Sequence, residues 1–154
     1  MKKTNIKNFK KTLSKFTTGV TVVCVKNNKK IYGKTVNSFN SLSLNPPLVL
    51  FSLGNYSSSI KTYINSNYLT INILSKRQKK ISNLFSMKNP NINDIKFLDG
   101  KNNTSFINGC IANLECKVVD RIKKGDHVIF ICKVINVHYD DKIKPLTYYN
   151  SKYN

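Results

Sequence analysis

The feature that most constrains the fold is a series of short apolar segments, rich in β-branched residues and separated by turns. Each has the length and composition of a strand, and they lie at residues 20–25, 48–53, 68–74, 112–119 and 128–137. They do not alternate with long helices, and no glycine-rich dinucleotide fingerprint follows any of them. The sequence therefore predicts a mainly β fold, an antiparallel barrel with a few short helices.

Polar turns connect two pairs of these strands into hairpins. Residues 27–30 lead into a return strand that starts at 31–33, and residues 123–126 join the two long strands near the end of the chain. A last short extended piece is predicted at 146–149. No internal repeat or linker is present, so we expect residues 1–154 to form a single domain.

Two polar segments are predicted to lack regular structure. Residues 37–45 are rich in Ser and Asn and end at Pro46-Pro47, where two backbone donors are missing. Residues 86–106 are rich in Asn, Asp and Lys, which predicts a long surface loop, and loops of that length often carry function.

Short helices are predicted at three places. Ile6, Phe9, Leu13 and Phe16 recur at helical spacing with lysines on the other face, so we expect an N-terminal helix that ends at residues 17–19 and packs on the body. The three serines at 57–59 can cap a second helix that begins near Ile60. Apolar residues at 81–85 indicate a third.

Composition excludes several classes of protein. No apolar run reaches the roughly 18 residues of a membrane span, and no secretory signal is recognisable, so a cytoplasmic location without membrane association is expected. Four cysteines at positions 24, 110, 116 and 132 match no zinc spacing and mostly lie in apolar runs. We expect small buried thiols, no disulfide and no metal.

The net charge of +19 is the extreme property of the composition. Only Arg77 and Arg121 are arginines, and the lysines are spread along the whole chain without interleaved aromatic residues. Proteins that bind nucleic acids favour arginine for bidentate contacts, so we expect no nucleic-acid partner. The charge is instead suited to attracting anionic ligands such as phosphates.

Few residues could perform acid–base chemistry without a cofactor. The chain contains seven acidic residues and two histidines, His127 and His138, and no Ser–His–acid set stands out. A bound cofactor that carries the chemistry is the natural alternative.

Several motifs in order along the chain resemble the flavin reductase family, the small NAD(P)H:flavin oxidoreductases of two-component monooxygenases, which have an FMN-binding split-barrel fold. The motifs are Phe16-Thr17-Thr18-Gly19-Val20-Thr21-Val22-Val23, preceded by Phe9 and Leu13; Gly33-Lys34-Thr35-Val36-Asn37-Ser38-Phe39; Ser41-Leu42-Ser43-Leu44-Asn45-Pro46-Pro47-Leu48-Val49; Ser57-Ser58-Ser59-Ile60; Gly125-Asp126-His127 after Leu114-Glu115-Cys116; and Pro145-Leu146-Thr147-Tyr148-Tyr149. The resemblance covers almost the whole chain.

The resemblance implies a set of cofactor-binding positions. Thr35, Asn37 and Ser38 carry the short hydroxyl and amide side chains that suit the ring edge of a flavin, and Phe39 is expected in the core. Lys34 and Val36 stand where family proteins usually carry Met and Ala, and Lys34 either points to solvent or pairs with a flavin phosphate. The full set is Gly33, Lys34, Thr35, Val36, Asn37, Ser38, Ser41, Ser52, Leu53, Ser57, Ser58, Ser59, Phe85, Tyr148 and Tyr149.

The remaining roles follow from the same resemblance. The serines at 57–59 are expected to hold the flavin phosphate at a helix N-terminus. This chain has Asn55-Tyr56 where many relatives have Arg or Lys nearby, which leaves Lys61 as a possible substitute. His127 is implied as the catalytic residue that positions the nicotinamide. Tyr148 and Tyr149 either cover the ring or are plain barrel-edge aromatics.

The resemblance predicts an enzyme that uses NADH or NADPH to reduce FMN or FAD and supplies the reduced flavin to a partner monooxygenase. An alternative is a non-catalytic FMN-binding split-barrel protein for electron transfer or flavin storage, and a nucleic-acid-binding barrel is suggested by charge alone. Family members are usually homodimers with the flavin at the interface, so a homodimer is predicted.

Overall fold

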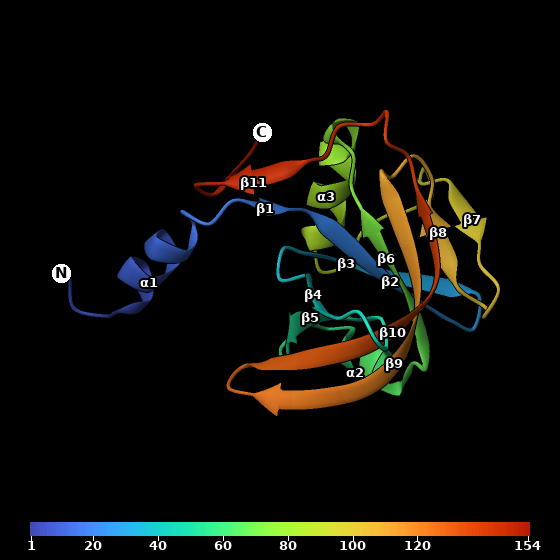
Figure 1. Cartoon of the computed structure of the whole chain (residues 1–154), viewed down its shortest axis with the longest axis horizontal. Helices are drawn as coiled ribbons and strands as arrows, with labels where there is room; N and C mark the ends of the chain where they lie inside the picture. Colours follow the sequence, from blue (N-terminus) through green and yellow to red (C-terminus); the bar gives the residue numbers. More distant parts are fainter.

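One antiparallel sheet of seven strands organises the computed structural model, which describes residues 1–154 (Figure 1). Its order across the sheet is β3 (Lys30–Val36), β2 (Thr21–Asn27), β6 (Tyr68–Ile73), β9 (Ala112–Lys124), β10 (His127–Tyr139), β5 (Leu48–Gly54) and β4 (Asn40–Ser43). The two edges do not pair with each other, although β3 contacts β5 across the gap. The prediction of a mainly β antiparallel split barrel is confirmed.

Turn chemistry explains the two hairpins that the sequence predicted. Asn28 and Lys29 both have positive φ, at 47° and 65°, which is the backbone conformation of a two-residue turn matched to the strand twist. Gly125 takes a φ of 56° at the tip of the β9–β10 hairpin. Both strands of that hairpin have 13 residues, longer than predicted, and two register shifts bend the pair.

The main hydrophobic core lies inside the barrel. Phe51 of β5 and Phe130 of β10 stack with ring centroids 5.0 Å apart, and helix α2 (Ile60–Asn65) closes one end with the buried Tyr63. The hydroxyl of Tyr63 donates to the backbone carbonyl of Val23 at 2.8 Å. Phe39 packs against this core, as predicted.

A second core lies between the sheet and helix α3 (Lys79–Ser86), which follows a single turn of 3₁₀ helix, η1 (Lys76–Gln78). Phe85 is fully buried there and rests on Gly33. A Cβ added at Gly33 would lie 2.4 Å from the Phe85 ring, so α3 can approach β3 this closely only because residue 33 is glycine. This contact places the end of α3 beside the end of β3.

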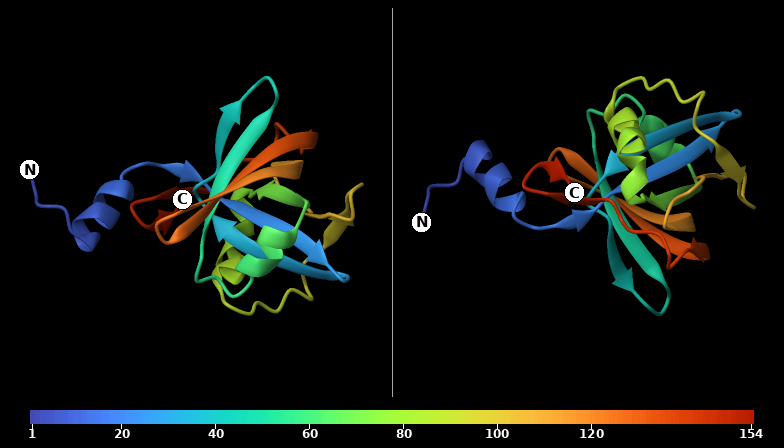
Figure 2. Two further views of the ribbon diagram at one scale, coloured as in Figure 1. Left: turned by 90° about the horizontal axis from the view of Figure 1, so that it is seen from below. Right: turned by 90° about the horizontal axis from the view of Figure 1, so that it is seen from above.

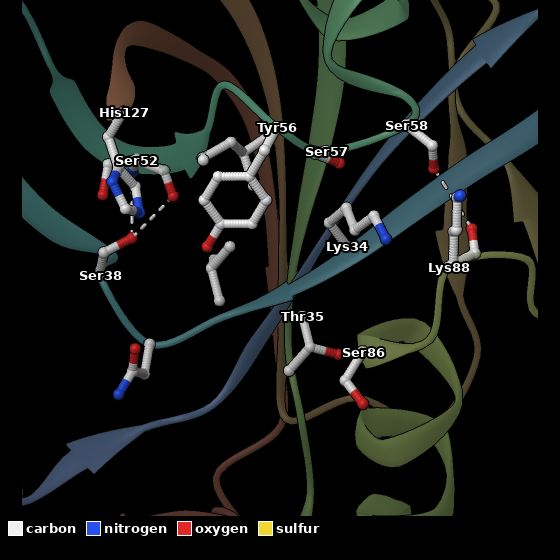
Figure 3. Close-up of a pocket in the computed structure, with 14 residues that line it drawn as sticks. Lys34, Thr35, Ser38, Ser52, Tyr56, Ser57, Ser58, Ser86, Lys88 and His127 are labelled. Atoms are coloured by element: carbon white, nitrogen blue, oxygen red, sulfur yellow. Dashed lines mark hydrogen bonds between the residues drawn. The ribbon is translucent and has the colours of Figure 1, made fainter. Parts of the chain in front are cut away.

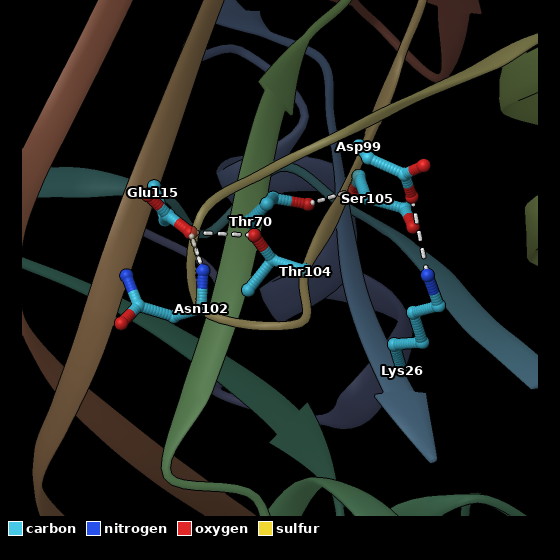
Figure 4. A network of polar contacts seen from close by, with 7 residues as sticks. All are labelled: Lys26, Thr70, Asp99, Asn102, Thr104, Ser105 and Glu115. Atoms are coloured by element: carbon cyan, nitrogen blue, oxygen red, sulfur yellow. Dashed lines mark hydrogen bonds and ion pairs between the residues drawn. The ribbon is translucent and has the colours of Figure 1, made fainter. Parts of the chain in front are cut away.

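The prediction of a long loop without regular structure at 86–106 is partly wrong. It contains a hairpin of β7 (Phe97–Asp99) and β8 (Ser105–Ile107). Glu115, a buried carboxylate on β9, holds the turn of this hairpin by accepting hydrogen bonds from Thr104 Oγ1 at 2.6 Å and from the backbone N–H of Asn102 at 2.9 Å (Figure 4). The segment 37–45, predicted as irregular, likewise contains β4, which pairs with β5.

The N-terminal helix forms but does not pack as predicted. Helix α1 (Ile6–Leu13) projects away from the barrel in all views and buries none of its residues (Figure 2). It ends at Leu13, earlier than expected, because the following chain turns into β1 (Thr18–Gly19). That strand pairs with β11 (Thr147–Tyr149), which pairs in turn with β12 (Lys152–Tyr153) in a small sheet that joins the two ends of the chain.

All four cysteines are free and buried. Burial raises the pKa of each thiol, so they stay neutral and behave as small apolar side chains, as predicted. No helix has both the length and the apolar character required to cross a membrane.

Candidate functional site

A cleft of about 560 Å³ opens where β3 and β5 end near each other at the split of the barrel (Figure 3). Ten of its lining residues were predicted from the sequence or belong to the predicted segments, and they are Lys34, Thr35, Val36, Asn37, Ser38, Ser52, Leu53, Ser57, Ser58 and His127. The remaining four are Gly54, Tyr56, Ser86 and Lys88. Residues far apart in the sequence therefore meet at one site.

The segment after β3 is held in place by its own hydroxyl groups. Thr35 Oγ1 donates to the backbone carbonyl of Ser82 on α3 at 2.7 Å. Ser38 Oγ accepts from the backbone N–H of Ser52 at 3.0 Å and donates to the carbonyl of Ser52 at 3.2 Å, which joins the two sides of the split. Asn37 lies between them, is exposed, and makes no hydrogen bond within the chain. Its amide is therefore free to bind a ligand.

Lysine side chains give one end of the cleft a positive charge. Lys34 Nζ donates to the carbonyl of Met87 at 2.9 Å, at the C-terminal end of α3, so its side chain lies along the cleft and does not point away into solvent. Burial lowers the pKa of its ammonium group. Lys88 also lines the cleft, and its backbone carbonyl accepts a hydrogen bond from Ser58 Oγ at 3.4 Å. No aspartate or glutamate lines the cleft.

The serines at 57–59 differ in part from their predicted arrangement. Ser57 and Ser58 line the cleft, whereas Ser59 is the N-cap residue of α2 and faces a neighbouring groove. Helix α2 has six residues, and the side chain of Ser59 makes no capping hydrogen bond. Lys61, considered as a substitute for a missing basic residue, is exposed and lines neither groove, whereas Lys88 lines both.

His127 begins β10 at the opposite end of the cleft. Its Nδ1 lies 2.7 Å from Asp126 Oδ1, and this hydrogen bond together with the charge of a protonated His127 lowers the pKa of the Asp126 carboxyl. The bond orients the ring and leaves Nε2 free. The Tyr56 ring lies edge-on to His127, with centroids 6.3 Å apart, and packs over Gly54, where an added Cβ would be 2.6 Å from the tyrosine ring.

Besides Ser59, five predicted positions lie outside the cleft. Phe85 is fully buried against Gly33, and Gly33 itself faces Phe85 and the neighbouring groove. Ser41 is exposed on β4. Tyr148 and Tyr149 both lie on the small sheet of β1, β11 and β12. Tyr148 packs on the second core. Tyr149 is exposed, and Lys15 Nζ lies 5.9 Å from the centroid of its ring. The structure favours the alternative of plain structural aromatics for this pair.

Sequence reasoning missed Gly54, Tyr56, Ser86 and Lys88. Tyr56 was noted only as a departure from the usual basic residue, yet its position after Gly54 is the signal that its ring could fold back over the strand end. Ser86 and Lys88 lie where α3 ends, and only the packing of Phe85 on Gly33 brings that end to the cleft.

A barrel with a cleft lined by hydroxyl groups, one free amide, a histidine and lysines belongs to the class of proteins that hold a polar, anionic cofactor beside a rigid sheet. The family model described as "Flavin reductase like domain" matches residues 13–154. The chain belongs to the flavin reductase family, and the predicted resemblance is confirmed.

Individual relatives agree with this assignment. The chain is 34% identical over 137 residues to "FMN reductase (NADH) SmoA" of Agrobacterium fabrum, an alignment that covers 89% of this chain and 79% of that protein. It is similar to the solved structure of flavin reductase PheA2 in its native state, with a TM-score of 0.90, 33% identity and coverage of 98% and 97% of the two chains. It is also similar to the NADH:FAD oxidoreductase SgcE6 of Streptomyces globisporus, with a TM-score of 0.92, 26% identity and coverage of 100% and 96%.

Proposed function

We propose that this chain is an NAD(P)H-dependent flavin reductase that transfers hydride from a nicotinamide to FMN or FAD. The observation that carries the proposal is the cleft at the split of the barrel, which unites the 34–38 segment, two serines and His127 in a member of the flavin reductase family. Relatives named as NADH-dependent reductases of FMN and of FAD support the same reaction and favour it over a non-catalytic flavin store.

The donor set of the cleft fits a flavin. The volume of the cleft, about 560 Å³, lies within the range of small-molecule sites. A bound flavin supplies an electron-accepting ring that takes the hydride, so the protein needs no base of its own for that transfer.

Each part of the chain then has a binding or orienting task. The Asn37 amide offers a donor and an acceptor to the ring edge, and the backbone of 34–38 is held firmly by the Thr35 and Ser38 bonds. Lys34 and Lys88 attract the phosphate. His127, fixed through Nδ1, presents Nε2 toward the open side, where it would orient the nicotinamide. Tyr56 lies edge-on to His127 and forms part of the cleft wall at that end.

A homodimer and a partner oxygenase complete the proposal. Helix α1 exposes its whole apolar face, and a second copy of the chain is the surface we propose to cover it. A relative named as the reductase subunit of a flavin-dependent monooxygenase, HsaB of Mycobacterium tuberculosis, supports an oxygenase as the acceptor of reduced flavin. We also propose that residues 1–154 form a single domain, and that the protein is cytoplasmic, which its free buried thiols support.

The reaction can be tested with purified protein, NADH or NADPH, and FMN or FAD. Consumption of the nicotinamide, followed by its absorbance, should exceed the rate without enzyme with at least one flavin. A His127→Ala variant should mainly raise the KM for the nicotinamide and leave flavin affinity unchanged. Absence of turnover with every combination, in protein that binds a flavin, would establish the non-catalytic alternative.

A further inference from the structure

The end of β3 takes its position from helix α3. Gly33 rests against the ring of Phe85, and two residues later the hydroxyl of Thr35 donates to the backbone carbonyl of Ser82 at 2.7 Å. Figure 3 shows the Thr35 side chain pointing toward this helix. Ser82 is fully buried. A shift of Ser82 would therefore move the 34–38 segment, which the Thr35 bond holds in place.

Tyr153 on β12 contacts the same residue of α3 through its side chain. The hydroxyl groups of Ser82 and Tyr153 lie 2.9 Å apart in a hydrogen bond, and the Ser82 side chain makes no other. The Tyr153 ring packs against the ring of Tyr148, its partner across β11 and β12, with centroids 5.2 Å apart. Lys79 Nζ, at the start of α3, lies 5.8 Å from the centroid of the Tyr153 ring. The small sheet therefore contacts α3 through this one tyrosine.

The small sheet that carries Tyr153 is itself anchored to the barrel. Its strand β1 is followed almost directly by β2 of the main sheet. Just before β11, the backbone N–H of Leu146 donates to the carbonyl of Leu74 at 2.9 Å, and both of these side chains are buried in the second core. Tyr153 therefore reaches α3 from a fixed support.

A hydroxyl group without a partner on Ser82 would alter the backbone of α3. Serine hydroxyls inside helices can bond the carbonyl four residues earlier, and this bond often bends the helix. In α3 that carbonyl belongs to Gln78, the residue that precedes the helix. The Tyr153 hydroxyl gives Ser82 another partner, so it keeps the backbone of α3 undistorted where the Ser82 carbonyl receives Thr35.

We propose that Tyr153 is a positioning residue for flavin binding, which acts through Ser82 on Thr35 and so on the backbone of the 34–38 segment. The inference rests on the proposed function, because it takes that segment as the binding site of the flavin ring. Tyr153 does not line the cleft, so its effect on the flavin is indirect.

The test is a double-mutant cycle in the full chain, with the Kd of FMN measured by quenching of flavin fluorescence. Tyr153→Phe removes the hydroxyl and keeps the ring, and Thr35→Val removes the hydroxyl at the other end of the path. Ser82→Ala removes the middle hydroxyl but keeps the carbonyl that Thr35 uses. Tyr139→Phe is the matched control, because Tyr139 is exposed at the end of β10 and its hydroxyl makes no hydrogen bond within the chain.

Tyr153→Phe and Ser82→Ala should each raise the Kd of FMN about threefold, the scale of one hydrogen bond, and the two together should raise it no further. Tyr139→Phe should leave the Kd unchanged. In the Thr35→Val background, Tyr153→Phe should have no effect on the Kd, because the connection to the 34–38 segment is already lost. Denaturant unfolding of each variant establishes that it is folded under the conditions of the titration.

An unchanged Kd in Tyr153→Phe, together with a lower free energy of unfolding, would show that the hydroxyl only stabilises the fold and would overturn the proposal. An equal rise of the Kd with and without Thr35→Val would also overturn it, since Tyr153 would then act by another route. In both cases the unchanged chain would still bind FMN and consume NADH, so the proposed function would stand. An unchanged chain that binds no flavin would overturn the proposed function itself, and this inference with it.

Discussion

At the scale of single residues, the three polar side chains after β3 have different tasks despite their similar chemistry. Thr35 and Ser38 use their hydroxyl groups in hydrogen bonds to Ser82 and Ser52, and these bonds fix the backbone at the split of the barrel. Asn37 alone keeps an uncommitted amide. The sequence motif does not separate these roles, because the partners of Thr35 and Ser38 are backbone groups far along the chain.

This difference predicts opposite effects of two alanine substitutions. Asn37→Ala should raise the flavin Kd about three- to tenfold, which corresponds to the loss of one hydrogen bond, without lowering the melting temperature. Ser38→Ala should instead lower the free energy of unfolding by about 1–3 kcal/mol, because it leaves two backbone groups of Ser52 unpaired.

Fluorescence titration and denaturant unfolding measure the two quantities for each variant. Asn40→Ala is the matched control, since Asn40 is also exposed, on β4, and lines no part of the cleft. A stability loss in Asn37→Ala with unchanged flavin affinity would contradict the assignment of its amide to the ligand.

At the scale of elements, the central strands could be predicted because their β-branched composition and turns are local properties. The β7–β8 hairpin and the position of α3 could not be predicted from the sequence. The β7–β8 hairpin depends on Glu115, and α3 reaches the cleft through the contact of Phe85 with Gly33, so both depend on pairs distant in sequence. Lys88 was missed for the same reason. Its segment has no pattern of its own, and long-range packing brings it to the site.

Glu115 should also make the stability of the β7–β8 hairpin depend on pH. Burial alone would raise the pKa of this carboxyl, but hydrogen bonds from Thr104 and Asn102 (Figure 4) and from Asn136 Nδ2 at 2.6 Å outweigh that effect and lower its pKa. A folded-state pKa below the unfolded one stabilises the protein above the unfolded pKa, which is about 4.3 for Glu. The stabilisation is lost as pH falls through the lower, folded-state pKa.

Replacing Glu115 by Gln should therefore flatten the acid side of the stability curve, in addition to lowering stability at neutral pH by about 1–3 kcal/mol. Denaturant unfolding at a series of pH values below neutrality measures both effects. Asp94→Asn is the control, because Asp94 is exposed and forms neither a hydrogen bond nor an ion pair within the chain. An unchanged slope in Glu115→Gln would show that other carboxylates cause the acid sensitivity.

At the scale of the whole molecule, the charge of +19 should accelerate the capture of anionic ligands. Raising the ionic strength from about 0.01 M to about 0.1 M shortens the Debye length from about 30 Å to about 10 Å. We expect the KM values for NADH and FMN to rise over this range while kcat stays constant. Riboflavin, which has no phosphate, is the control acceptor, and a parallel rise of its KM would point to an effect of salt on the protein itself.

The exposed face of α1 is the feature of the whole molecule that one chain does not explain. Ile6, Phe9 and Leu13 of α1 are 76%, 56% and 56% exposed, and Phe16 just after the helix is 76% exposed. A helix of eight residues is marginal in water on its own, even with the N-cap bond that Asn5 provides, so it needs a surface against which to bury this face. The proposed surface is the barrel of a second copy, since each buried large apolar side chain contributes about 1.5–3 kcal/mol.

Light scattering should therefore find twice the 17.6 kDa mass of one chain. A Phe9→Asp, Leu13→Asp double variant should shift the protein to the monomer, whereas Lys11→Asp on the polar side of the same helix should not. If the cleft is completed at the interface between the two copies, the monomeric variant should also bind flavin more weakly than the unchanged chain, although its substitutions lie outside the cleft. A monomeric unchanged chain with full flavin affinity would show that α1 has another partner and that one barrel suffices for the site.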